Sequence, residues 1–310
     1  MLARRLLLAA PALLAIRPAR AQSVLRVGDQ RGGMQALMKA ASVLDGLPYH
    51  VEWSQFAAAA PLLEAVNANA VDTTFAGDAP VTFALASGVP AKIVAVTRGT
   101  GASTAIVVPA GSPIRTPQDL RGRRIATNRG SIGHALVLAA AERFGWGDAV
   151  KIANLLPSDA KAALTSGAVD AWSTWNTYVA QAVLNDADRV VVDGSDGLLT
   201  GLSFQVARPE AIAGKSAELA DFIGRATRAH RWALDNAALY ARALAAEIGV
   251  SEAIALRSFQ TDRSAAVPID DQVVADEQRT ADRYFAAHVI PQRLDAAGVF
   301  ERAFNPIVTG

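Results

Sequence analysis

Short runs of β-branched and apolar residues alternate along the chain with longer Ala- and Leu-rich segments of helical pattern. This alternation is typical of parallel sheets covered by helices, so it predicts an α/β fold. The predicted strands cover residues 25–28, 50–53, 73–76, 92–97, 104–108, 123–127, 150–155, 171–174, 189–192 and 202–207.

After residue 207 the strand pattern stops and the chain becomes helical. Long helical segments are predicted at residues 217–248, 251–258 and 269–288. A carboxy-terminal part of this size is expected to pack back on a lobe formed by the preceding chain.

Two stretches recur at the same offset, which predicts that the molecule contains two similar halves. Residues 25–33 align with residues 123–131, and Ala70-Val71-Asp72 aligns with Ala168-Val169-Asp170. In each half a strand runs into a glycine-containing turn and then a helix. Helix N-terminal amides at the carboxyl end of a strand are where open α/β sheets bind ligands. We therefore expect a small anion between the halves, with helix N-termini on both sides.

Two points where the chain could cross between lobes define the expected domains. The Pro- and Gly-containing residues 109–113 suit the first crossing, and the run before Arg208 suits the return. This predicts a first lobe of residues 22–108 plus 204–310, a second lobe of residues 109–203, and two hinge crossings between them.

The first residues resemble an export signal. Arg4-Arg5 precede an apolar run at residues 6–16, and Ala19-Arg20-Ala21 resembles a cleavage site before Gln22. We expect residues 1–21 to be removed and the protein to work in the periplasm. The paired arginines leave both the Sec and the twin-arginine export routes open.

Charge and cysteine content narrow the class further. Residues 1–21 contain four arginines and no acid, so the remaining chain has 26 Lys and Arg against 29 Asp and Glu, a net charge of about −3. It has no Lys/Arg-rich run, which argues against nucleic-acid binding. The absence of cysteine excludes disulfides and a lipid-modified cysteine anchor.

Candidate binding residues lie at the ends of predicted strands. Residues 128–134, Asn-Arg-Gly-Ser-Ile-Gly-His, follow one strand and begin a helix, so glycine and free amides could approach an oxyanion. Gly77-Asp78 and Trp175-Asn176 end two further strands at equivalent positions of the repeat. Asp78 and Asn176 are also residue types that cap helices. Trp175 and Phe56 could cover an apolar ligand tail or belong to the core.

Signatures of catalysis are missing. The four histidines are scattered without metal-ligand spacing, and the HExxH, GxSxG and Walker sequences do not occur. These residues and motifs favour a binding function over catalysis and give no reason to expect a cofactor or a metal.

Taken together, these motifs resemble the aliphatic sulfonate-binding proteins of bacterial ABC importers, a branch of the sulfonate, nitrate and taurine receptor family. The resemblance covers essentially the whole chain after residue 21. It rests on Leu25-Arg26-Val27-Gly28, Gly77-Asp78-Ala79-Pro80, residues 112–116 with 119–122, Gly130-Ser131, residues 168–172 and Thr280-Ala281-Asp282.

The resemblance implies a type II periplasmic-binding-protein fold, in which two lobes close on one ligand and the closed monomer docks on a membrane permease. Ligand contacts carried over by position are Gln30, Phe56, Gly77, Asp78, Gly130, Ser131, His134, Trp175 and Asn176. We expect the ligand to be an alkanesulfonate, held by the amides of both turns and by the Ser131 hydroxyl.

Three departures from the family pattern affect the ligand. Asp29 stands where an aromatic residue is usual, Asn176-Thr177 stands where Asp-Pro is usual, and the first glycine turn is shortened. Taurine, nitrate, an aromatic sulfonate and a small carboxylate therefore stay open as ligands. An enzyme of the thiamine-pyrimidine synthase type is the alternative from another class, but such enzymes use a cysteine-rich motif that this chain lacks.

Overall fold

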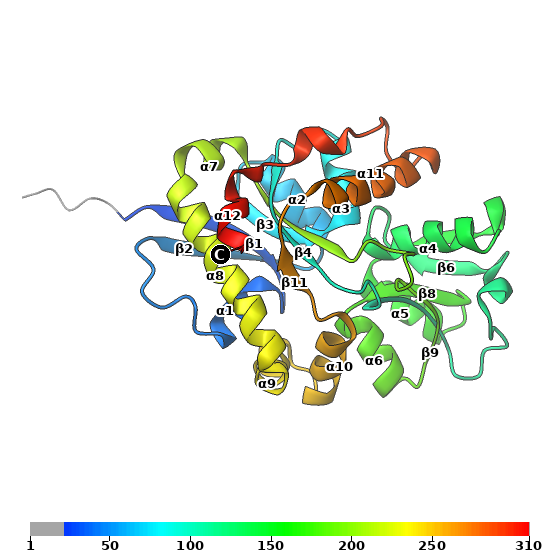
Figure 1. Ribbon diagram of the computed structural model, residues 1–310. Helices are drawn as coiled ribbons and strands as arrows, with labels where there is room; N and C mark the ends of the chain where they lie inside the picture. Colours follow the sequence, from blue (N-terminus) through cyan, green and yellow to red (C-terminus); the bar gives the residue numbers. More distant parts are fainter. Residues whose placement is uncertain (1–21, 310) are drawn as a thin grey trace, which may run out of the picture.

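The computed structural model describes residues 22–309, so the predicted signal peptide lies outside the described residues. The chain forms two α/β lobes (Figure 1). The first sheet has the order β11-β4-β10-β3-β1-β2. Its strands are β1 (Val24–Gln30), β2 (His50–Phe56), β3 (Thr73–Gly77), β4 (Lys92–Arg98), β10 (Leu202–Ala207) and β11 (Ala265–Val267).

The second sheet has the order β7-β6-β8-β5-β9. Its strands are β5 (Thr104–Val108), β6 (Arg124–Thr127), β7 (Lys151–Asn154), β8 (Ala171–Trp175) and β9 (Arg189–Asp193). In the first sheet the parallel strands β2-β1-β3 lie side by side, and β10 pairs antiparallel with β3. In the second sheet the parallel strands β7-β6-β8 lie side by side, and β5 pairs antiparallel with β8. The two sheets therefore share one topology.

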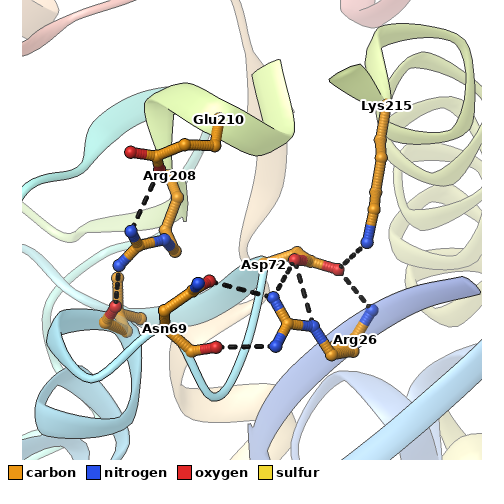
Figure 2. Close-up of polar contacts among 7 residues, drawn as sticks. Arg26, Asn69, Asp72, Arg208, Glu210 and Lys215 are labelled. Carbon is orange, nitrogen blue, oxygen red and sulfur yellow. Dashed lines mark hydrogen bonds and ion pairs between the residues drawn. The ribbon is translucent and has the colours of Figure 1, made fainter. Parts of the chain in front are cut away.

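Strand register and backbone hydrogen bonds confirm the internal repeat. Val27 pairs with Thr73 in the first sheet, and their equivalents Ile125 and Ala171 pair in the second. The backbone N–H of Arg26 donates to Asp72 over 2.8 Å, and that of Arg124 donates to Asp170 over 2.8 Å. Figure 2 shows the first of these contacts, where the Arg26 guanidinium and Lys215 both reach the Asp72 carboxylate.

Helices cover both faces of the first sheet because each face carries alternate apolar side chains. One face packs against α1 (Met34–Ala40), α8 (Ser216–Asp235), α9 (Ala237–Ile248) and α12 (Asn305–Thr309). The other face packs against α2 (Ala59–Asn67), α3 (Asp78–Ala86) and α11 (Asp271–Ala286). The short helix α7 (Pro209–Gly214) leads into α8.

The second sheet packs against α4 (Ile132–Arg143) on one face and against α5 (Pro157–Thr165) and α6 (Thr177–Asn185) on the other. Trp172 lies in this core, as expected, with 2% of its surface exposed. The short 3-10 helices are Pro117–Leu120, Gly147–Ala149, Ala296–Val299 and Arg302–Phe304.

The carboxy-terminal helices touch both lobes. In Figure 1, α11 extends from α3 towards α4, and α10 (Glu252–Asp262) lies next to α6. The Tyr284 hydroxyl of α11 donates to the Ser131 carbonyl over 2.9 Å, and Arg283 forms an ion pair with Glu142 of α4. The helical part thus packs on the first lobe, as predicted, and also contacts the second.

Four predictions about the chain's path are wrong. The first crossing lies at residues 99–103 and not at 109–113, because β5 belongs to the second sheet. The return crossing is residues 194–201, so the predicted boundary at 204 falls inside β10. Strands also continue after residue 207, since β11 extends the first sheet next to β4, and the predicted helix 217–248 is divided at Asn236.

The two crossings are in direct contact, and glycine residues permit this close approach. The Gly99 N–H donates to the Gly201 carbonyl over 2.9 Å. Gly201 has φ +68°, and a Cβ there would overlap the Gly99 carbonyl oxygen. At the end of α10, the Asp262 carbonyl accepts from the Thr100 N–H over 3.4 Å and the Thr261 carbonyl accepts from the Thr100 hydroxyl over 2.9 Å, so the carboxy-terminal part is tied to the first crossing.

Candidate functional site

A cavity of about 890 Å³ lies between the lobes and reaches into the first lobe. The strand ends of both sheets line it, namely those of β1 and β3 on one side and of β6 and β8 on the other. The lobes touch at its edge: a Cβ at Gly77 would lie 4.0 Å from Cβ of Ile132, and one at Gly130 would lie 2.9 Å from Cγ of Phe83. These glycines allow the two walls to approach, which encloses the space between them.

The second-lobe wall begins at the turn before α4. Ser131 is the N-cap of α4 and accepts a hydrogen bond from the His134 N–H over 3.2 Å. Its own hydroxyl donates to the Asn128 carbonyl over 2.6 Å. Among the described residues, no group accepts from the N–H of Ile132 or Gly133, which are the first two of the helix. The free donors of this turn are therefore backbone amides. The Ser131 hydroxyl donates to Asn128, and its expected contact with the ligand stays a prediction.

A second helix start lies beside the first, because β6 and β8 are neighbours and parallel. Asn176, the N-cap of α6, has φ +50° and makes no side-chain cap. Within the described part of the chain, the N–H groups of Thr177 and Tyr178 have no acceptor, and both residues line the cavity. Trp175 also lines it, with its ring edge-on to Tyr178 at 6.1 Å. The second lobe thus presents two helix N-termini at one edge of its sheet.

The first-lobe turn differs, because its own carboxylate occupies the helix start. Asp29 accepts hydrogen bonds from the N–H groups of Gln30, Met34 and Gln35 over 2.7–3.0 Å. A Cβ at Gly33 would overlap Asp29 Oδ1, so only glycine fits there. Burial raises the pKa of Asp29 to about 6, against the lowering effect of these backbone donors. The expectation of free amides on both sides therefore fails at α1.

Asp78 likewise points away from the cavity. It is 1% exposed, and its carboxylate accepts from the Ala79 N–H over 2.6 Å and from the hydroxyls of Thr200 and Thr280. Burial raises its pKa, and the hydrogen bonds from Thr200, Ala79 and Thr280 oppose this shift. Asp78 connects α3, the return crossing and α11, which is a structural arrangement.

The cavity brings together six of the nine predicted site residues: Gln30, Gly77, Gly130, Ser131, Trp175 and Asn176. It does not include Phe56, Asp78 or His134. Phe56 packs in the core under α2 and α3. The His134 Nδ1 accepts a hydrogen bond from the Gly130 N–H over 3.1 Å, so this side chain stabilises the turn before α4. Burial, reinforced by the charge of Arg129, lowers the pKa of His134 to about 4.

Two arginines were not singled out from the sequence. Arg31 and Arg129 occupy equivalent positions of the repeat, and both line the cavity. Neither forms an ion pair with a described residue, and Arg129 donates to the Val289 carbonyl over 3.4 Å. Their matching position in the aligned turns was the signal that could have identified them. They place one cation from each lobe at the cavity.

Within residues 22–309, no group of three or more His, Cys, Asp or Glu side chains could hold a metal ion. No helix in this part of the chain is long and apolar enough to cross a membrane.

Comparison with known proteins places this geometry in a family. The model of the family described as NMT1/THI5 like matches residues 50–236, more than half of the chain. The chain belongs to the NMT1/THI5-like family. The alkanesulfonate-binding protein SsuA from Xanthomonas axonopodis pv. citri, solved with MOPS bound, is 29% identical with a TM-score of 0.85, over 92% of this chain and 100% of that one.

A second similar solved structure is that of the periplasmic aliphatic sulphonate binding protein SsuA from Escherichia coli. It is 28% identical with a TM-score of 0.82, over 91% of this chain and 92% of that one. The desulfurization enzyme DSZB shares the fold alone, with 18% identity and a TM-score of 0.68 over 93% of this chain and 99% of that one. The type II periplasmic-binding fold predicted from the sequence is thereby confirmed.

Proposed function

We propose that this protein is the substrate-binding component of an ABC importer for aliphatic sulfonates. The observation that carries the proposal is the pair of adjacent helix N-termini, at α4 and α6, whose free amides border a cavity also lined by Arg31 and Arg129. The sulfonate-binding proteins similar to this chain support the choice of ligand.

The chemistry of the donors suits a permanently ionised group. A sulfonate needs hydrogen-bond donors and no base, and here the donors are backbone N–H groups and guanidinium groups. Each helix N-terminus stabilises an anion by about 0.3–1 kcal/mol when exposed and up to about 2 kcal/mol when partly buried. Because micromolar binding requires about −8 kcal/mol, the arginines and apolar contact with Trp175 have to supply the rest.

The first lobe argues against taurine as the preferred ligand. An ammonium group needs a carboxylate with free acceptor capacity. Asp29 lines the cavity, but three backbone N–H groups already donate to its carboxylate. Glu64 also lines the cavity, but it is exposed, where solvent weakens an ion pair with an ammonium group. A volume of about 890 Å³ is also far larger than nitrate requires.

Delivery to a membrane permease follows from the two-lobe construction. A ligand that contacts both walls favours the closed arrangement, which a permease can distinguish from the open one. We infer that the protein acts in the periplasm as a monomer, and that it binds and releases its ligand without catalysis.

Calorimetric titration of the ligand-free protein tests the proposal. Pentanesulfonate is expected to bind one-to-one, and more tightly than taurine, nitrate or sulfate. Thr177→Pro should weaken this binding about fivefold, because proline suits the first position of a helix but removes a free N–H. Tight binding of a carboxylate or nitrate, with no binding of any sulfonate, would overturn the ligand.

A further inference from the structure

Part of the cavity extends away from the anion-binding wall, into the first lobe. We call this part the inner arm and define it by Gln205, Thr227, His230, Ser264 and Ala266, which all line the cavity. It lies between the sheet, at β10 and β11, and α8. Ser203, which pairs with Gly77 at the strand end, and Gln205 lie on the same face of β10. Gln205 is therefore roughly 7 Å deeper than the cleft edge, at about 3.4 Å per strand residue.

Gln205 lines the inner arm and has a carbonyl oxygen without a hydrogen-bond partner. The residue is 2% exposed, and its Nε2 donates to Thr73 Oγ1 over 3.1 Å. Thr73 Oγ1 donates its only proton to the Val206 carbonyl over 2.8 Å, so it can only accept from Gln205. This fixes the orientation of the amide. Gln205 Oε1 is buried without a hydrogen-bond partner.

His230 offers a second unpaired acceptor. Burial lowers the pKa of His230, and the Ser264 backbone opposes this shift, as a carbonyl acceptor does, so we assign the ring proton to Nδ1. Nε2 of the ring is buried and has no partner. Burial lowers the pKa of His230 to about 4, so the ring is neutral at pH 7 and its second nitrogen carries a lone pair.

Buried acceptors without donors cost free energy, and two that line one cavity point to a ligand that donates. The defining side chains of the inner arm carry no charge at pH 7, which favours a neutral donor over an ammonium group. We propose that the inner arm is a subsite for a hydroxyl group at the far end of the ligand, so that the protein prefers sulfonates with a terminal hydroxyl over simple alkanesulfonates. This inference rests on the proposed function.

The test compares two ligands of nearly equal size, 4-hydroxybutanesulfonate and pentanesulfonate, by calorimetric titration. The wild-type protein should bind the hydroxylated ligand at least about tenfold more tightly, because only its hydroxyl can donate to the unpaired acceptors. Gln205→Met should reduce this preference below about threefold and leave pentanesulfonate bound. Gln181→Met is the matched control, since Gln181 lines the cavity on α6 outside the inner arm and should leave the preference unchanged.

A second measurement uses the wild-type protein and so needs no variant. The ¹⁵N resonance of His230 Nε2 in the wild-type protein should move upfield on addition of 4-hydroxybutanesulfonate, but not of pentanesulfonate, because the lone pair then accepts a hydrogen bond. Equal affinity for the two ligands, with no shift at His230, would overturn the subsite and leave the sulfonate function standing. Binding of neither ligand would overturn both.

Discussion

The two lobes share a topology and a ladder register, yet their equivalent turns differ in charge. At three repeat positions the first lobe has Asp29, Gly33 and Asp78, where the second has Thr127, Ser131 and Asn176. The first-lobe carboxylates accept hydrogen bonds from amides at the starts of α1 and α3, whereas amides of α4 and α6 stay free. We therefore propose that the second lobe holds the anion and that the first lobe closes the cavity over it.

Exchanging the residues at the starts of α1 and α4 should change the stability of the protein most. Gly33→Ser gives the first lobe the cap of the second, but its Cβ would overlap Asp29 and lie 2.8 Å from the Gln30 carbonyl oxygen. We expect a loss of about 3 kcal/mol in the free energy of unfolding, measured by urea denaturation.

The reverse change and a double variant serve as controls. Ser131→Gly should cost under about 1 kcal/mol, because glycine is tolerated as an N-cap. Asp29→Thr combined with Gly33→Ser reproduces the second-lobe pair and should recover much of the loss. Strict additivity of the two changes would contradict the claim that Asp29 occupies the cap.

The repeated contact between an arginine and an aspartate is buried in the first lobe and exposed in the second. The Asp72 side chain is 5% exposed and binds both Arg26 and Lys215, whereas Asp170 is 40% exposed. Asp72→Asn should lower the free energy of unfolding by about 2 kcal/mol and Asp170→Asn by less than about 1 kcal/mol. Similar losses in both variants, on denaturant titration, would mean that burial does not distinguish the two pairs.

Arg31 of the first lobe and Arg129 of the second lobe should contribute unequally to sulfonate affinity. Arg129→Gln should weaken pentanesulfonate binding about tenfold, because a charge-assisted donor beside α4 is lost. Arg31→Gln should weaken it less than about threefold, since Arg31 adjoins the turn already occupied by Asp29. Calorimetry on the two variants measures both values, and a larger effect of Arg31 would reverse the assigned roles.

The smallest expected effect is a pH dependence specific to the first lobe. Burial raises the pKa of Asp29 from 3.8 to about 6, so its contribution to stability is complete below pH 4 and is lost as pH rises through 6. Its negative charge also disappears as pH falls. Pentanesulfonate should therefore bind about fivefold more tightly at pH 5 than at pH 7. Asp29→Asn should flatten the profile, and an unchanged slope in that variant would exclude Asp29 as its source.

Much of the fold could be predicted because each strand is a compact apolar run and the repeat ties two distant segments together. The first crossing was misplaced because Pro109 and Gly111 resemble a linker, while the glycines that allow the crossing, Gly99 and Gly101, adjoin a strand on each side. The strand β11 was missed because three residues carry too little periodicity to distinguish them from a loop.

Of the candidate site, the sequence could predict only the backbone positions that lie at the ends of strands. Backbone positions such as Gly77 and Gly130 line the cavity because the sheet places them there. Side-chain direction was not predictable: Asp78 and His134 adjoin the right turns but point into the protein. Gln205 and His230 lie far from any glycine turn, so only tertiary packing reveals that they line the same cavity.

The most direct test of the account follows backbone amides by ¹⁵N–¹H correlation spectroscopy while pentanesulfonate is added. The account predicts large, saturable downfield shifts for the amide protons of Ile132 and Thr177, which have no acceptor in the described structure. The amides of Met34 and Gln35 should move little, because Asp29 already accepts from them. Large shifts at Met34 and Gln35, with none at Ile132 and Thr177, would contradict the assignment of the anion to the second lobe.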